Sequence, residues 1–202
     1  MLVLRMLNKN SLLILKKSIF NQLKYLELKR KINKIKLLVL DVDGVLTDGK
    51  LYLDTQGSLM KSFDVKDGLG IKLLQEHNIK VVFFSGGAGG ATEKRAETLK
   101  IDFYQVGIKN KFTALANLQK KLALKKEDTA YVGDDLNDIP VKKLVNIFFA
   151  PRDSSKYVLK ACDVILKKNG GNGAIRELSE RILNTKKSFS YIKKKGWLES
   201  NE

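Results

Sequence analysis

From residue 36 onward, short apolar runs alternate with segments of helical periodicity, and this alternation constrains the fold more than any other feature of the chain. Apolar runs of this length are typical of buried strands. They lie at 36–43, 80–86, 102–107, 129–135, 146–151 and 163–168, and helical patterns occupy 67–78, 89–100, 111–124, 136–144 and 173–183. The repeat predicts an α/β fold, with a mostly parallel sheet covered by helices on both faces. Segment 49–63 is outside this repeat and is expected to form a β-hairpin that turns at Gln56–Gly57.

The two ends of the chain differ in composition from the middle. Residues 1–36 contain ten Lys or Arg and a single acid, Glu27, among many apolar residues, so we expect a basic amphipathic helix. Such a helix is either a solvated extension or a docking element for a membrane surface or a partner. We therefore predict a basic N-terminal extension at 1–35, an α/β domain at 36–184 and a loose, polar tail at 185–202.

Composition limits the classes of function. The 202 residues carry a net charge of +16, yet 32 of the 38 basic residues are lysine. No arginine-rich stripe interleaved with aromatic residues occurs, so we expect anionic small molecules rather than nucleic acid as partners. No apolar run approaches the roughly 20 residues of a spanning helix, and we expect no membrane insertion. The single cysteine, Cys162, fits a reducing cytoplasm.

Acidic and polar residues follow three of the expected strands. They form DVDG at 41–44, SGG at 85–87 and GDDLND at 133–138. Because parallel strands end at the same edge of a sheet, these segments should converge on one crevice. Carboxylates from two strands, Asp41 and Asp134, would then hold a hard cation. Mg²⁺ is favoured because it takes oxygen ligands and no His or Cys lies near these strands.

This pattern suits phosphoryl transfer. Asp41 could attack phosphorus in line and form an aspartyl phosphate, while Asp43 protonates the leaving oxygen and then takes a proton from the hydrolytic water. The Ser85 hydroxyl and the neighbouring backbone N–H groups could bind phosphoryl oxygens. Either Lys111 or Lys109 would neutralise the charge that develops in the transition state.

In this order, the motifs resemble those of the haloacid dehalogenase superfamily of phosphatases, and more closely its 3-deoxy-D-manno-octulosonate 8-phosphate phosphatase branch. The resemblance covers about residues 36–183 and is carried by LDVDGVLTDG, FDVKDGLGIKLL, KRAETLKID, GIKNKFTAL, YVGDDLNDIPV and GGNGAIRELSERIL. It implies a Rossmann-like parallel sheet without a cap and with a small β-hairpin insertion. It also implies a Mg²⁺-dependent cytoplasmic phosphatase that acts on a phosphorylated 3-deoxy sugar acid in lipopolysaccharide biosynthesis. The implied assembly is a homotetramer in which the hairpin builds a central barrel.

The resemblance also implies roles for individual residues. Asp41 is the nucleophile and a metal ligand, Asp43 is the general acid and base and binds the metal through its backbone carbonyl, and Asp134 is the remaining metal carboxylate. Lys111 matches the family lysine better than Lys109. The other implied site residues are Ser85 and Gly86 at the phosphoryl group, Asp135 and Asp138 in support of the metal site, and Asp67, Gly68, Gly171 and Arg176 near the substrate.

One position departs from the family pattern. Gly87 stands where members that act on the eight-carbon sugar acid usually carry an arginine, which would suit a substrate carboxylate. The nine-carbon acylneuraminate and deaminated-neuraminate 9-phosphates therefore stay open as substrates. A nucleotide or nucleic-acid phosphatase is a further alternative, favoured by charge alone. A non-catalytic binding subunit is another, although the nucleophile, acid, serine, lysine and metal carboxylate of the pattern are all present.

Overall fold

The computed structural model describes residues 9–185 and 189–196. Six strands form one sheet in the order β5-β4-β1-β6-β7-β8, and every neighbouring pair is parallel. The strands are β1 (Leu37–Asp41), β4 (Lys80–Phe84), β5 (Phe103–Gln105), β6 (Thr129–Val132), β7 (Ile147–Ala150) and β8 (Val164–Ile165). The predicted parallel α/β sheet is confirmed.

Helices cover both faces of this sheet, which explains why its central strands are mostly apolar. On one face lie α2 (Val65–Glu76), α3 (Ala91–Thr98) and α6 (Ala174–Leu183), and on the other α4 (Lys111–Lys121), the 3₁₀ segment η3 (Leu136–Leu144) and α5 (Lys156–Ala161). Leu38 and Leu40 of β1 pack toward the first face, and Leu37 and Val39 pack toward the second. A short 3₁₀ turn, η2 (Lys126–Asp128), precedes β6. The six-residue α5 was not expected, because it is too short for helical periodicity to be recognised.

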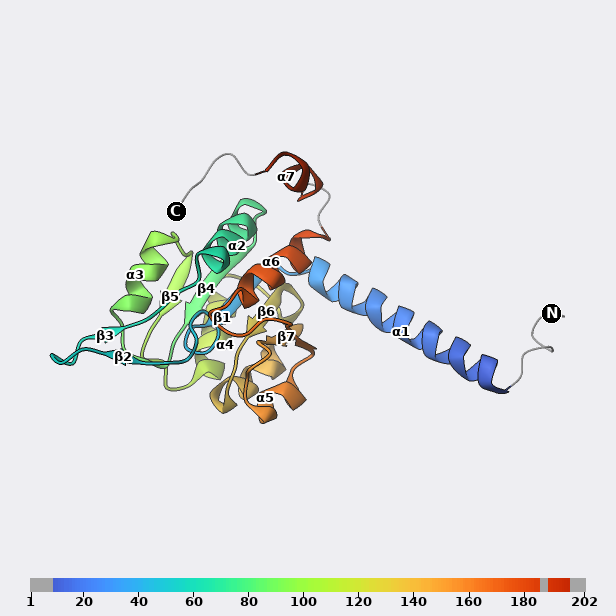
Figure 1. Cartoon of the computed structure of the whole chain (residues 1–202), viewed down its shortest axis with the longest axis horizontal. Helices are drawn as coiled ribbons and strands as arrows, with labels where there is room; N and C mark the ends of the chain where they lie inside the picture. Colours follow the sequence, from blue (N-terminus) through green and yellow to red (C-terminus); the bar gives the residue numbers. More distant parts are fainter. Residues whose placement is uncertain (1–8, 186–188, 197–202) are drawn as a thin grey trace.

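A two-stranded antiparallel hairpin projects from the domain (Figure 1). It comprises β2 (Tyr52–Leu53) and β3 (Leu59–Met60). The Asp54 carboxylate accepts the backbone N–H groups of Gln56 and Ser58, and Gly57 adopts a φ of 81°. The predicted turn at Gln56–Gly57 is therefore confirmed. Within the described part of residues 36–184, this hairpin is the one sheet insertion, and no cap covers the fold.

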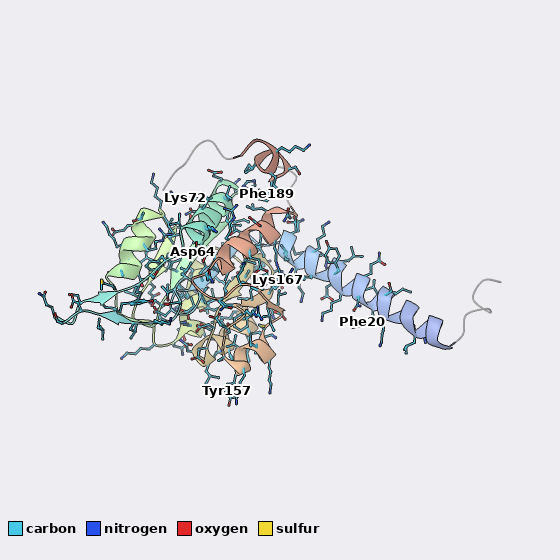
Figure 2. The ribbon with its side chains drawn as sticks, in the orientation of Figure 1. Phe20, Asp64, Lys72, Tyr157, Lys167 and Phe189 are labelled. Carbon is cyan, nitrogen blue, oxygen red and sulfur yellow. The ribbon has the colours of Figure 1, made fainter. Side chains whose placement is uncertain are left out.

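The N-terminal extension forms a long helix, α1 (Lys9–Asn33), and most of it stands clear of the domain (Figure 1). Phe20 on this free part is 67 % exposed (Figure 2), whereas Ile32 at the other end is buried against the core. Phe20 and Tyr25 are about 1.4 helical turns apart, so apolar side chains do not share one face. The helix is as expected, but its apolar side chains are spread more widely than in a clean amphipathic pattern. Residues 1–8 lie outside the described residues.

The tail is more ordered than expected. Residues Phe189–Lys195 form α7, and Phe189 is buried in the same core cluster as α2 and α6 (Figure 2). Its ring meets the His77 ring edge-on, with the centroids 6.4 Å apart. The expectation of a loose tail is wrong for this helix, because one buried aromatic side chain anchors it; residues 186–188 and 197–202 lie outside the described ranges. No helix in the described part of the chain combines the length and hydropathy needed to cross a membrane.

Candidate active site

Three central strands of the sheet lead to one cavity. β1 lies between β4 and β6, so Asp41, Ser85 and Asp134 meet at the carboxyl edge of the sheet, where α/β folds bind ligands. The cavity has a volume of about 310 Å³. It is lined by Asp41, Asp43, Gly49, Gly86, Gly87, Lys111, Asp134, Asp135 and Asn137. Five charged residues predicted from the sequence are thus brought together from segments far apart in the chain: Asp41, Asp43, Lys111, Asp134 and Asp135. The predicted Ser85 and Asp138 are buried beside the cavity and do not line it.

Lys111 is the buried cation at the floor of this cavity. It is the first residue of α4, whose start is capped by the Asn110 side chain accepting the N–H of Thr113. Its Nζ lies 2.8 Å from Asp41 Oδ2 and 2.7 Å from Asp138 Oδ1, and its side chain is only 2 % exposed. Burial alone lowers the pKa of Lys111, but the two carboxylates outweigh burial and raise it. Lys111 therefore stays charged and balances part of the acidic cluster.

Asp138 holds the loop that follows β6. It is fully buried, and its Oδ1 accepts both Lys111 Nζ and the Tyr131 hydroxyl, the latter at 2.6 Å. Its Oδ2 accepts the backbone N–H groups of Asp134 and Asp135 at 3.0 and 3.4 Å. These four donors occupy both oxygens, so Asp138 is suited to support its neighbours rather than to bind a ligand.

Asp41 and Asp134 form the pair that fits a cation. Carboxylate oxygens of Asp41, Asp134 and Asp138 lie within 4.8 Å of one another. Burial, followed by the charge of Asp138, raises the pKa of Asp41 well above its usual value and that of Asp134 to about 6. Acids this crowded need more positive charge than Lys111 supplies. Asp138 already accepts four protein donors, whereas Asp41 accepts two, so Asp41 and Asp134 are the carboxylates with acceptor capacity left for a hard divalent cation.

Asp43 lies at the mouth of the cavity beside Ser85. Its side chain is 35 % exposed, and the Ser85 hydroxyl donates to its Oδ2 at 3.3 Å. The backbone N–H of Gly87 donates to Ser85 Oγ at 3.1 Å, which orients the hydroxyl toward the acid. Asp43 also forms an ion pair with Lys61, whose Nζ lies 2.7 Å from Oδ1. A carboxyl group in this position faces both solvent and the phosphate-binding candidates.

Gly44 makes room for the Asp134 carboxylate. Its φ of +80° lies in the left-handed region, and a Cβ built there would stand 2.1 Å from Asp134 Oδ2. Thr47 closes the same loop, since its Oγ1 accepts the N–H groups of Gly44 and Gly49 at 3.3 and 3.2 Å. Glycine is therefore required at this position for the two acidic loops to approach each other.

Asp67, Gly68 and Arg176 are not among the residues that line this cavity. Asp67 is 1 % exposed and accepts the backbone N–H of Arg176 at 2.7 Å, which joins α2 to the first turn of α6. Gly68 is buried on α2. The Arg176 guanidinium pairs with Glu180 at 2.8 Å and lines a separate surface hollow. Within one chain these residues join two helices, and their contact with substrate stays a prediction.

The glycine-rich loop before α6 packs against the loop that follows β1. A Cβ at Gly170 would stand 1.9 Å from the carbonyl oxygen of Gly44, and one at Gly171 would stand 2.4 Å from the carbonyl carbon of Thr47. The N–H of Gly171 donates to Val45 O at 3.0 Å. Close backbone contact thus accounts for both glycines, and a substrate role for Gly171 also stays a prediction.

Sequence reasoning missed three residues at or beside the cavity. Lys61 pairs with Asp43, Tyr131 donates to Asp138, and Asn137 lines the opening. Lys61 carries no signal because it is one of 32 lysines, and Tyr131 reads as one more core residue of an apolar strand. Asn137 lies inside GDDLND, where its position after two acids could have drawn attention to it.

Comparisons with known proteins agree with this geometry. The sequence profile of the haloacid dehalogenase-like hydrolases matches residues 101–178. The 3-deoxy-D-manno-octulosonate 8-phosphate phosphatase KdsC of Haemophilus influenzae is 40 % identical over 174 residues, which cover 86 % of this chain and 97 % of that protein. A cobalt-bound structure of the Haemophilus influenzae phosphatase is 42 % identical, with a TM-score of 0.74 over 77 % of this chain and 91 % of that chain. The enzyme of Moraxella catarrhalis, in complex with magnesium ion, phosphate ion and KDO, is 34 % identical, with a TM-score of 0.80 over 83 % and 97 % of the two chains.

Proposed function

The chain belongs to the haloacid dehalogenase superfamily and, within it, to the 3-deoxy-D-manno-octulosonate 8-phosphate phosphatase branch of phosphatases, and from this we propose that it hydrolyses 3-deoxy-D-manno-octulosonate 8-phosphate through an aspartyl phosphate. The observation that carries the proposal is the convergence of Asp41, Asp43, Lys111 and Asp134 on one cavity. Relatives named for this activity support the substrate. The reaction would take place in the cytoplasm and supply a precursor of lipopolysaccharide.

Asp41 would be the nucleophile. Its Oδ1 accepts the N–H of Val42 at 2.8 Å and its Oδ2 lies 2.8 Å from Lys111 Nζ, so the carboxylate is held in one orientation. Attack forms a bond from a carboxylate oxygen to phosphorus while the ester oxygen–phosphorus bond breaks. Lys111 would neutralise charge on the transferring phosphoryl group, with the Ser85 hydroxyl and the Gly86 N–H as further donors.

Asp43 would move the protons. It would give one to the ester oxygen as that oxygen leaves, and would then take one from the water that attacks the aspartyl phosphate. The second step breaks the bond from Asp41 to phosphorus, releases phosphate and restores both acids. The partial exposure of Asp43 at the cavity mouth supports this role, since both the leaving group and water must reach it.

Mg²⁺ is the proposed cofactor. The Asp41 and Asp134 carboxylates, with the backbone carbonyl of Asp43, would hold it, and Asp135 and Asp138 would support the site. When bound, the ion supplies positive charge that offsets the carboxylates and the phosphate dianion. The all-oxygen donor set and the raised pKa values of Asp41 and Asp134 support a site for such an ion.

The nine-carbon sugar acids are the second candidate substrates, favoured by Gly87. Gly87 lines the cavity and offers no guanidinium to a substrate carboxylate, where the branch usually carries an arginine. Phosphate release should therefore be measured with octulosonate 8-phosphate, neuraminate 9-phosphate, hexose phosphates and a 3′-phosphorylated oligonucleotide, with and without Mg²⁺. Metal-dependent turnover of the octulosonate that Asp41→Asn abolishes is expected. Turnover unchanged by this substitution would refute the mechanism, and no turnover of any phosphate ester would favour a binding subunit.

A homotetramer is the proposed assembly. The hairpin exposes four apolar side chains, at Leu51, Tyr52, Leu53 and Met60, and each of them is at least 40 % exposed. A small hairpin with this much exposed apolar surface supports a subunit interface, because isolated two-stranded hairpins are marginal in water. In such an assembly, neighbouring subunits would complete each active site.

A further inference from the structure

Lys61 is a buried lysine next to the candidate general acid. It follows β3 directly, and its side chain is only 2 % exposed. Its Nζ lies 2.7 and 2.9 Å from the two oxygens of Asp43 and 3.1 Å from the hydroxyl of Thr92. An ammonium group has three N–H donors, and these three acceptors use all of them. Lys61 therefore has no donor left for a substrate.

The position of Lys61 is behind Asp43 rather than inside the cavity. Asp43 lines the cavity and is 35 % exposed, whereas Lys61 does not line it and is almost completely buried. A buried ammonium group is unfavourable unless it is paired. The contacts of Lys61 with Asp43 and Thr92 therefore fix the positions of all three side chains. Thr92 lies in the first turn of α3 and is 1 % exposed. The contact thus fastens Asp43 to both the hairpin segment and α3.

Gly87 leaves the space that this contact needs. A Cβ at position 87 would stand 3.3 Å from Asp43 Oδ2, 3.4 Å from Ser85 Oγ and 3.8 Å from Lys61 Nζ. The contact with Asp43 Oδ2 is slightly closer than an ordinary van der Waals contact, so the carboxylate would have to shift by a few tenths of an ångström to admit a Cβ. Gly87 is therefore compatible with Lys61 lying beside Asp43.

We propose that Lys61 is the positioning residue for Asp43 in the phosphatase reaction. Through its contacts of 2.7 and 2.9 Å it holds the carboxyl group of Asp43 in one orientation, toward the leaving oxygen. Lys61 itself transfers no proton and contacts no substrate. The proposal rests on the proposed function, in which Asp43 protonates the leaving group.

The test compares two leaving groups in the full-length protein with Mg²⁺. An alkoxide leaving group, as in octulosonate 8-phosphate, needs a proton, whereas the nitrophenolate of p-nitrophenyl phosphate leaves without one. For Lys61→Met we expect kcat/KM to fall about 100-fold for the sugar phosphate and less than about 5-fold for the aryl ester, since general acid catalysis is worth about 10²–10⁴-fold. Thr92→Val removes one partner of the ammonium and should produce the same selective loss at smaller size.

Lys72→Met is the matched control. Lys72 lies on α2, away from the cavity (Figure 2), and both substrates should be turned over as in the wild type. Equal losses on both substrates in folded Lys61→Met, or no loss on either, would overturn the proposal. If Lys61→Met does not fold, Thr92→Val decides by the same ratio. A failure of the proposed function would differ, because the wild type itself would then not hydrolyse octulosonate 8-phosphate.

Discussion

Removal of the Lys111 charge should destabilise the protein and abolish activity together. In Lys111→Met, the buried Asp138 loses its 2.7 Å ion pair and Asp41 loses its 2.8 Å ion pair. Breaking a buried ion pair by removing one partner costs about 3–5 kcal/mol, because an uncompensated charge remains. For a domain of this size, that lowers the melting temperature by on the order of 10 °C. The loss of charge stabilisation in the transition state should lower kcat by about 10²–10³-fold.

The assay is thermal unfolding in EDTA, repeated with excess Mg²⁺. The cation should recover part of the lost stability, because it restores positive charge at Asp41 and Asp134. Lys109→Met is the matched control: Lys109 lies two residues away, is exposed and should leave both stability and activity unchanged. If Lys111→Met has the same melting temperature as Lys109→Met and retains turnover, the reasoning about the buried cluster is refuted.

Three further perturbations test other parts of the structure. Gly44→Ala should abolish activity and weaken Mg²⁺ binding at least 10-fold in a calorimetric titration. Gly57→Ala, with the same backbone strain but open space around its Cβ, should lower stability alone. Equal effects of the two substitutions on activity and Mg²⁺ binding would exclude the clash with Asp134. Burial raises the pKa of Asp67 to about 6, so its neutral form stabilises the fold below about pH 4 and that contribution is lost as the pH rises through 6. The stability of Asp67→Asn relative to wild type should therefore increase by roughly 1.5 kcal/mol from pH 5 to pH 8 in urea unfolding, and no change would contradict a buried carboxyl. Leu53→Lys should convert the proposed tetramer to smaller species in light scattering, and an unchanged mass would exclude the hairpin interface.

The architecture follows from local pattern because the central strands of the sheet are covered on both faces. β1, β4 and β6 are mostly apolar, and each is followed by a reactive segment, so the position of the site follows from one rule about parallel sheets, whereas the order of the strands was not predicted. Short or weakly patterned elements were harder to recognise. The anchoring of α7 depends on the contact of Phe189 with His77 at the end of α2. These two residues are more than 100 positions apart, so no local sequence pattern predicts the contact.

The residues of the candidate site also differ in whether the sequence alone could predict them. Asp41, Asp43 and Asp134 stand in recognisable motifs, and their chemistry constrains their roles. Lys61 could not be predicted, because it is one of 32 lysines in the sequence. Its importance depends on the fold of the hairpin, which places it beside Asp43. Asp67 is the opposite case. Its position in a family motif implies contact with the substrate, whereas within one chain its side chain accepts the Arg176 N–H at the start of α6.

The most direct test of the central claim is to trap the phosphorylated enzyme. Wild-type protein with Mg²⁺ would be mixed with octulosonate 8-phosphate, quenched in acid within milliseconds and mapped by peptide mass spectrometry. We predict one phosphoryl group on Asp41, formed at a rate no slower than turnover and absent from Asp41→Asn. Turnover without any phosphorylated protein, or a phosphoryl group on another residue, would contradict the proposed role of Asp41.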